Sequence, residues 1–189
     1  MDSCAIVVRR ASAADADVVA RAVAMAIGDV PTLTEYCGED YLAVLRAIVL
    51  TPNTQYSWHN ALVAEVGGIV QGTIVGYDGA QLGVLREGTF AILRDKVGRT
   101  PKISDETEAG EYYLDSIAVE PEFRSCGVGR ALILSLCDRA AAEGHSRVGL
   151  IVDCSNPQAE RLYSSLGFER VGERIFFGHQ MWHLQKKVK

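Results

Sequence analysis

Residues 124–129 read RSCGVG, and the stretch that follows, GRALILSLCDRAAAEG (129–144), has the pattern of an amphipathic helix. The apolar positions of this helix lie four apart, at Val128, Leu132, Leu136 and Ala140. In front of the glycines lies YYLDSIAV (112–119), which is rich in residues that favour strands. A strand end followed closely by a helix start gathers unpaired main-chain N–H groups at one point, with the positive end of the helix dipole behind them. Such a point favours an anion.

The two glycines suit a phosphate group. Gly127 and Gly129 have no β-carbon, so a phosphate can approach the main chain closely, and Arg124 adds a fixed positive charge. We interpret residues 124–129 as a cradle for a pyrophosphate. The alternative that these glycines serve only close packing stays open. The stretch lacks the Gly-Lys-Ser/Thr ending of a Walker loop and the GxGxxG pattern of dinucleotide-binding folds.

RSCGVG resembles the R/Q-x-x-G-x-G/A signature of the GCN5-related N-acetyltransferases, the GNAT family, in which this loop holds the pyrophosphate of acetyl-CoA. LDSIAVEPEFR (114–124) resembles the family's central strand, and IVDCSNPQAERLYSSLGFERVG (151–172) resembles its second conserved block. The N-terminal IVVRRASAADADVVARAV (6–23) is similar to the family's opening strand and helix.

The resemblance implies a fold of the α/β (α+β) class in one domain, 1–189. It implies a mixed central β-sheet of about six to seven strands flanked by helices, the GNAT fold, with a splayed central parallel strand pair. The residues agree with this order. ALVAEV (61–66) and IVQGTIVGY (69–77), joined by Gly67-Gly68, predict an antiparallel hairpin. In the C-terminal half, strand, helix, strand and helix follow one another, which predicts parallel pairing.

The remaining elements follow from local signals. Ser12 is expected to cap a helix that runs to about residue 27, and DYLAVLRAIVL (40–50) predicts a second helix that stops before Pro52. RVGLIVD reads as a buried strand, PQAERLYSSLGF as a helix, and ERVGERIFF with HQMWHLQ as a final strand pair. Residues 78–110, between the predicted hairpin and the strand at 112–119, are hard to interpret. REGTFAILRDKVG predicts a short helix, and PKISDETEAGE (101–111) predicts a mobile surface loop.

By resemblance, the donor is acetyl-CoA and its binding residues fall in three groups. Main-chain groups around the end of the central strand would hold the pantetheine arm, the loop would hold the pyrophosphate, and a residue of the second block would contact the arm. These residues are Ile117, Ala118 and Val119; Arg124, Ser125, Cys126, Gly127, Val128, Gly129 and Arg130; and Asn156. An asparagine before proline can equally cap the helix that follows it.

Three residues are candidates for catalysis. Tyr163 lies where the family often places a phenol that protonates the departing thiolate, although an aromatic residue in such a helix can also be simply part of the core. Asp115 lies within an apolar strand, where a buried carboxylate needs a reason, and it is the first candidate for the general base. Glu111 is the second. The alternative for Asp115 is a hydrogen bond to a neighbouring loop.

Other candidate sites are weaker. Tyr56, Trp58 and His59 can line an acceptor pocket, but we favour packing for them. His179 and His183, four apart in a predicted strand, lie too far from each other to share a metal, and the cysteines show no CxxC pair, so no metal site is expected. Cys126 and Cys154 have no histidine partner that the sequence reveals, which argues against an acyl-cysteine route.

Composition narrows the class of partner. A net charge of −5 would repel nucleic acid, and no stretch has the length and hydrophobicity of a membrane span. We therefore expect a cytoplasmic protein with no nucleic acid or membrane as partner. The resemblance implies an N-acetyltransferase whose acceptor is a primary amine of a small molecule, peptide or protein. The acidic balance favours a cationic acceptor, and the resemblance is compatible with a homodimer. Two alternatives stay open: a non-enzymatic acyl-CoA-binding sensor, and a fold that binds another nucleotide at the glycine turn.

Overall fold

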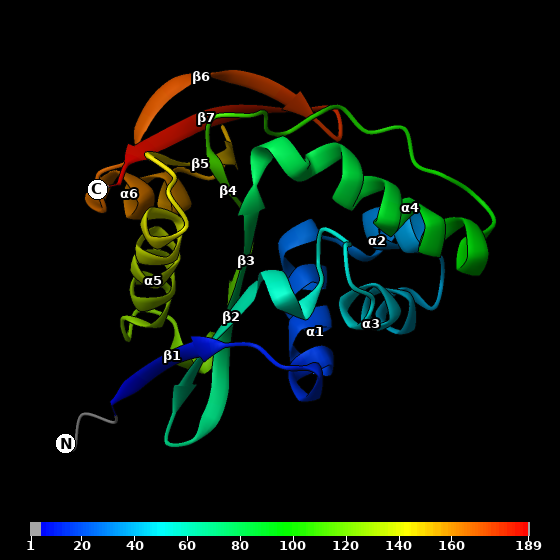
Figure 1. Cartoon of the computed structure of the whole chain (residues 1–189), viewed down its shortest axis with the longest axis horizontal. Coiled ribbons are helices and arrows are strands. Elements are labelled where there is room, and N and C mark those ends of the chain that lie inside the picture. Colours follow the sequence, from blue (N-terminus) through cyan, green and yellow to red (C-terminus); the bar gives the residue numbers. More distant parts are fainter. Residues whose placement is uncertain (1–4, 189) are drawn as a thin grey trace.

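A seven-stranded mixed sheet runs through the computed structural model, which describes residues 5–188 (Figure 1). The strand order is β1-β2-β3-β4-β5-β7-β6. The strands are β1 (Ile6–Arg10), β2 (Ala61–Val66), β3 (Ile69–Asp78), β4 (Tyr112–Val119), β5 (Arg147–Asp153), β6 (Glu169–Phe176) and β7 (His179–Lys187). The helices are α1 (Ala16–Ile27), α2 (Val30–Cys37), α3 (Tyr41–Leu50), α4 (Leu82–Val97), α5 (Val128–Ala142) and α6 (Pro157–Ser165). This arrangement confirms the expected fold class.

The centre of the sheet is opened between two strands. β4 and β5 are parallel, whereas the other neighbouring strands pair antiparallel. Only Tyr112 with Val148 and Tyr113 with Gly149 are matched across this pair. Beyond Tyr113 the β5-facing edge of β4 has no strand partner, so its main-chain groups are free to bind something else. The predicted splay of the central parallel pair is therefore confirmed.

The two faces of the sheet are covered by different helices. α5 and α6 lie on one face, and α1 to α4 lie on the other (Figure 1). Alternation along β2 serves both layers, because Leu62 and Ala64 belong to the core beneath α5 while Ala61 and Val63 belong to the core beneath α1. Along β4 the same alternation places Tyr113 and Asp115 on the α1–α4 face.

Local signals explain the ends of several elements. The carboxylate of Asp15 accepts hydrogen bonds from the main-chain N–H and the hydroxyl of Ser12, which starts the first helical segment at a short 3-10 turn. Gly67 and Gly68 both have positive φ and join β2 to β3 in the predicted hairpin. The stripe predicted for α5 is buried along its whole length.

Three expectations about residues 28–111 need correction. α2 was not predicted, because it has only 8 residues; its N-cap is Asp29, whose side chain accepts from the N–H of Thr32. α4 has 16 residues and starts at Leu82, well before the short helix predicted from residue 86. Residues 101–111 contain no helix or strand and are mostly exposed, as expected for a surface loop, but Glu106, Thr107 and Glu111 are at most 3% exposed and attach the segment to the rest of the molecule.

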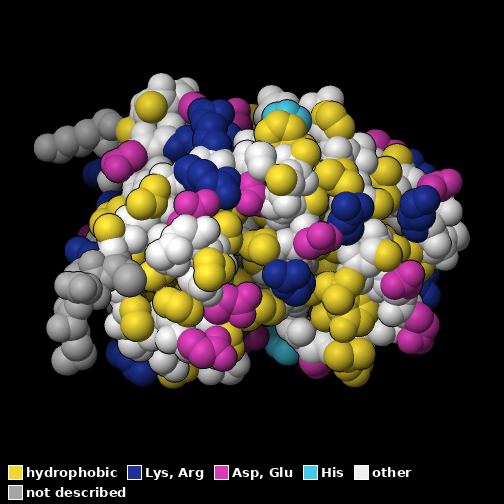
Figure 2. Space-filling model, turned by 90° about the horizontal axis from the view of Figure 1, so that it is seen from below, with side chains coloured by type: hydrophobic (Ala, Val, Ile, Leu, Met, Phe, Trp, Pro, Cys, Tyr) yellow, Lys and Arg dark blue, Asp and Glu magenta, His cyan; other side chains and the backbone are white. Residues whose placement is uncertain are grey.

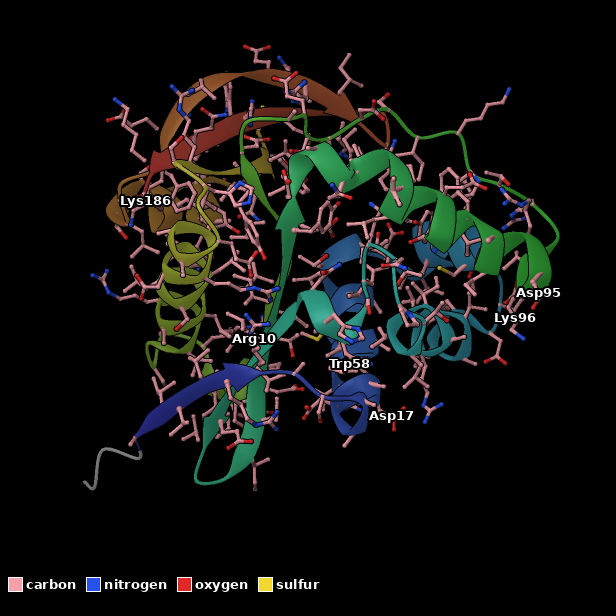
Figure 3. The ribbon with its side chains drawn as sticks, in the orientation of Figure 1. Arg10, Asp17, Trp58, Asp95, Lys96 and Lys186 are labelled. Atoms are coloured by element: carbon pink, nitrogen blue, oxygen red, sulfur yellow. The ribbon has the colours of Figure 1, made fainter. Side chains whose placement is uncertain are left out.

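Charged side chains mark the periphery of the molecule. Figure 3 places Asp95 and Lys96 at the outer end of α4 and Lys186 at the opposite end, near α6. On the face seen in Figure 2, acidic and basic side chains are interspersed with apolar ones. Among residues 5–188, no helix combines the length and hydrophobicity that crossing a membrane would need.

Candidate active site

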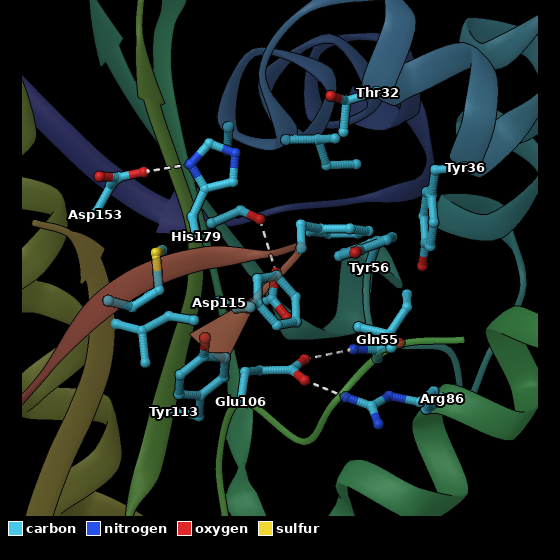
Figure 4. Close-up of a pocket in the computed structure, with 18 of the residues that line it drawn as sticks. Thr32, Tyr36, Gln55, Tyr56, Arg86, Glu106, Tyr113, Asp115, Asp153 and His179 are labelled. Atoms are coloured by element: carbon cyan, nitrogen blue, oxygen red, sulfur yellow. Dashed lines mark hydrogen bonds and ion pairs between the residues drawn. The ribbon is translucent and has the colours of Figure 1, made fainter. Parts of the chain in front are cut away.

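A cavity of about 340 Å³ lies on the α1–α4 face, beside the opening between β4 and β5 (Figure 4). Its walls come from the α1–α2 region, residues 55–56, α4, residues 103–106, β4, β5 and the β6–β7 turn. The aromatic and charged residues of its lining are Tyr36, Tyr56, Tyr113, Phe176, Phe177, Glu35, Glu106, Asp115, Asp153, Arg86 and His179. The volume is at the lower end of the range for small-molecule sites.

Hydrogen bonds hold two of the four carboxylates that line this cavity, Asp115 and Glu106, in place. Asp115 accepts a hydrogen bond from the Tyr77 hydroxyl and another from the Ser116 hydroxyl, both 2.7 Å long. Glu106 accepts one from the side-chain amide of Gln55, 3.1 Å away, and pairs with Arg86. The same Gln55 amide also donates to the Tyr77 hydroxyl at 3.2 Å, so a continuous set of side chains joins the two carboxylates.

The pKa values of both carboxyls are raised. Burial raises the pKa of Glu106 to about 7; the charge of Asp115 adds to this effect, and that of Arg86 opposes it. Burial also raises the pKa of Asp115, against the hydrogen bonds from Tyr77 and Ser116. Titratable groups tuned toward neutral pH in a cavity are typical of sites that transfer protons.

The glycine loop provides free donors at the start of α5. Ser125 and Gly127 have positive φ, and the main-chain N–H groups of residues 127–130 have no hydrogen-bond partner among the described residues. A β-carbon on Gly129 would meet nothing closer than Val119 Cγ2, at 3.7 Å. Unpaired N–H groups, open space and a helix N-terminus fit a pyrophosphate. Arg124 lies at the edge of this loop, where its Nε donates to the carbonyl of Val119 at 3.2 Å.

The sequence profile of the acetyltransferase (GNAT) family matches residues 31–168, more than half of the chain. The chain belongs to the acetyltransferase (GNAT) family. A solved structure described as an acetyltransferase is 33% identical, with a TM-score of 0.82 over 97% of this chain and 100% of that one. Its likeness confirms that the GNAT fold extends over nearly all of the chain.

Two curated GNAT relatives match over shorter stretches. N-alpha-acetyltransferase RimI of Mycobacterium tuberculosis is 34% identical over 116 residues, which cover 61% of this chain and 56% of that protein. Mycothiol acetyltransferase of Kocuria rhizophila is 43% identical over 70 residues, 37% of this chain and 22% of that protein. The chain thus spans between about a fifth and somewhat over half of the length of these two relatives.

The predicted cofactor-binding residues outside the glycine loop lie at the end of β4 and at the start of α6. Ile117, Ala118 and Val119 pair with β3 on one side and face the opening on the other. Asn156 caps α6, since its side-chain oxygen accepts from the N–H of Ala159 at 3.1 Å. This contact agrees with the capping interpretation and leaves the amide NH₂ free. The role of Asn156 toward the pantetheine arm stays a prediction.

The predicted acid, Tyr163, lies in α6 on the α5 side of the sheet. It is 7% exposed, packs edge-on against Phe168 and makes no side-chain hydrogen bond among the described residues. Burial raises its pKa to about 12. A hydroxyl that stays protonated at neutral pH has a proton to donate there. Its catalytic role stays a prediction.

The second candidate base, Glu111, lies outside the cavity. Its carboxylate accepts from the Thr107 hydroxyl at 2.6 Å and from the Gln185 amide at 2.7 Å, and lies 2.9 Å from Nε2 of His183. It is 1% exposed, and nothing in the lining of the cavity comes from it. The structure therefore separates Glu111 from Asp115, which lines the cavity.

Several residues that line the cavity escaped sequence reasoning. Tyr56 lines the cavity, which corrects the preference for simple packing, whereas Trp58 and His59 stack on each other with ring centroids 3.7 Å apart. Glu106 and Arg86 lie in the segment that the sequence left hard to interpret. The only available signal was the run of acidic residues in SDETEAGE, and such a run is more often a solvated surface.

The two histidines of β7 and the cysteines lie elsewhere. His179 Nδ1 lies 3.1 Å from Oδ2 of Asp153 at the cavity wall, and His183 contacts Glu111. Within residues 5–188, no three His, Cys, Asp or Glu side chains are grouped as metal ligands. The free cysteines of this part of the chain are Cys37, Cys126, Cys137 and Cys154.

Proposed function

We propose that this GNAT protein is an acetyl-CoA-dependent N-acetyltransferase that acts on a primary amine of a small molecule or peptide. One observation carries the proposal: a cavity with two carboxylates of raised pKa adjoins the free edge of β4. An amine reacts only when neutral, so the acceptor site needs a group that takes its proton. Family membership supports the donor.

The residues of the chain divide the work between the two faces of the sheet. Acetyl-CoA, when bound, supplies the acetyl thioester that the amine attacks. The N–H groups at the start of α5 would hold its pyrophosphate, and the free edge of β4 would hold its pantetheine arm and polarise the carbonyl. On the other face, Asp115 would take part in removing the proton of the amine. Tyr163, which lies on the same face as α5, would donate a proton to the departing thiolate.

The acceptor is proposed from the cavity and from the relatives together. The cavity size suits a small amine or the end of a peptide. Among the relatives, RimI of M. tuberculosis is named an N-alpha-acetyltransferase, and an Escherichia coli relative is named for the alanine of ribosomal protein bS18. Cytoplasmic localisation, a single domain over 1–189 and homodimer formation stay predictions.

The test has two steps. Calorimetric titration with acetyl-CoA should show binding that Gly129→Val weakens at least tenfold, because the side chain obstructs the cradle, while Gly83→Val, at a helical position with no atom within 4 Å of its added β-carbon, should not. A thiol-release assay over a panel of primary amines should then reveal turnover. Absence of acetyl-CoA binding in the folded protein would overturn the proposal, and binding with no turnover would favour a sensor.

Tyr163 gives a separate prediction. Tyr163→Phe keeps the ring that packs on Phe168 and removes only the hydroxyl. We expect kcat to fall roughly 10-fold to 100-fold with little change in the affinity for acetyl-CoA. An unchanged kcat over the whole pH range would refute the role of Tyr163 as the acid.

A further inference from the structure

The charges around the cavity do not balance. Arg86 pairs with both Asp105 and Glu106, and its NH2 group also donates to the carbonyl of Ser104 at 3.2 Å. His179 is already paired with Asp153. Among the described residues Asp115 has hydroxyl donors and no cation. Within residues 5–188, the lining of the cavity carries four carboxyl groups, those of Glu35, Glu106, Asp115 and Asp153, but only one arginine and one histidine. Its acidic groups therefore outnumber its basic ones, which favours a bound cation.

We propose that Glu106 and Asp115 together bind the ammonium group of the acceptor and that Glu106 takes its proton, held in place by Arg86 and Gln55 as positioning residues. This inference rests on the proposed function and narrows its substrate class. The acceptor is a cationic primary amine whose carbon chain lies against the aromatic walls formed by Tyr36, Tyr56 and Phe177.

The two carboxylates have different parts in this step. Hydroxyl groups of Tyr77 and Ser116 donate to the two oxygens of Asp115, one to each, and so stabilise its charged form. These hydrogen bonds oppose the burial that raises the pKa of Asp115, and in the proposed complex the ammonium group adds to their effect, so that Asp115 supplies the negative charge that attracts the amine. One N–H bond of the ammonium breaks, its proton forms an O–H bond with the Glu106 carboxylate, and the electron pair stays on the nitrogen. The products are a neutral amine and a neutral carboxylic acid, which later gives the proton to water.

Glu106 is well placed for this role. It is 3% exposed and comes from a segment that Arg86 holds through three consecutive residues, 104–106. The charged groups that act on Glu106 are Asp115 of β4, Arg86 of α4 and Asp105 of its own segment. The titratable hydroxyls of Tyr77 of β3 and Tyr113 of β4 lie near it, and Glu35 of α2 lines the same cavity. Burial and Asp115 raise the pKa of Glu106 to about 7, against the effect of Arg86, so the group exchanges its proton near neutral pH.

The first test needs neither the donor nor turnover. Carbon-13 NMR of labelled carboxyl groups should show Glu106 titrating near pH 7 in the free protein. In Asp115→Asn its pKa should fall by about one unit, because the neighbouring charge is gone, whereas Glu108→Gln, at a 70% exposed carboxyl of the same segment, should leave it unchanged. A normal glutamate pKa, or no response to Asp115→Asn, would overturn the proposal.

Binding of an ammonium group is tested with the same signal. Propylammonium chloride should lower the apparent pKa of Glu106 more than sodium chloride at equal concentration, because a bound cation stabilises the carboxylate. Equal shifts with the two salts would contradict ammonium binding. This result does not depend on acetyl-CoA, so it separates failure of this inference from failure of the proposed acetyltransferase activity.

Kinetics with the best amine of the panel complete the test. Glu106→Gln should lower kcat roughly 100-fold or more, and Asp115→Asn should move the acidic limb of the pH profile to lower pH. Arg86→Lys keeps a cation but loses the fork that holds the segment, so it should lower kcat less than Glu106→Gln and shift the same limb. Normal kcat and an unchanged profile in Glu106→Gln would refute the role of Glu106.

Discussion

Glu106 and Glu111 lie five positions apart in one segment, and both are almost fully buried, at 3% and 1% exposure. Their surroundings differ. The carboxylate of Glu111 is surrounded by Thr107, His183 and Gln185. Glu106 receives a hydrogen bond from Gln55 and shares Arg86 with Asp105, and it faces the charge of Asp115.

The two pKa values therefore move in opposite directions. Burial raises both, but in Glu111 the hydrogen bonds from His183, Thr107 and Gln185 outweigh burial and the pKa is lowered. In Glu106, burial and a like charge prevail over Arg86. The comparison teaches that burial alone does not make a carboxylate functional. The donors that surround it and the charge that faces it decide whether it stays ionised or exchanges a proton.

The largest effect on stability is expected at Gly149 of β5, which lies against the carboxylate of Glu111. A β-carbon on Gly149 would lie 1.8 Å from Oε2 of Glu111, so Gly149→Ala must displace that carboxylate from its donors. We expect a loss of about 3 kcal/mol in the free energy of unfolding, measured by urea denaturation. Gly172→Ala, whose β-carbon would meet nothing within 4 Å, is the control. Equal stability of the two variants would show that the cluster is not tightly packed.

The pH dependence of stability should distinguish the two carboxylates. Glu106 has a folded-state pKa of about 7, above its ordinary 4.5, so the folded state binds more protons between these values and stability falls as pH rises through them. Glu106→Gln should remove roughly 2 kcal/mol of this fall. For Glu111 the pKa is lowered, so its contribution is present above the ordinary value and is lost as pH falls below it. Denaturation of both Gln variants at pH 5 and pH 8 would measure the difference, and similar pH dependence in the two would contradict it.

The smallest effect on catalysis is expected when Glu111 is substituted. Glu111→Gln should cost about 1–2 kcal/mol of stability, because one donor loses its acceptor. Its kcat should change less than twofold, and the acidic limb of its pH profile should stay in place, since Glu111 lies outside the cavity. The measurement is the kcat profile of the folded variant beside that of Glu106→Gln. A shifted limb in Glu111→Gln would mean that the two carboxylates act together.

Local patterns predicted the elements that frame the site but not the cavity. β4 was predicted with its observed bounds, and of the two glycines of RSCGVG Gly127 caps α5 at positive φ while Gly129 lies in its first turn. These features depend on residues next to one another in the chain. Asp115 was selected because a carboxylate within an apolar strand is unusual, and the structure places it at the cavity. Glu106 had no such signal, because residues 101–111 follow neither strand nor helix periodicity.

The sequence by itself determined the strands, the helices other than α2, the start of α5 and the resemblance to the GNAT family, because each depends on short-range spacing and on turn and cap residues. Only the tertiary structure decided which carboxylates face each other. Glu106 meets Gln55 and Arg86 across 51 and 20 positions, and Glu111 meets His183 across 72. The pKa of a buried group depends on distances through space, and the local sequence around these two glutamates does not contain those distances.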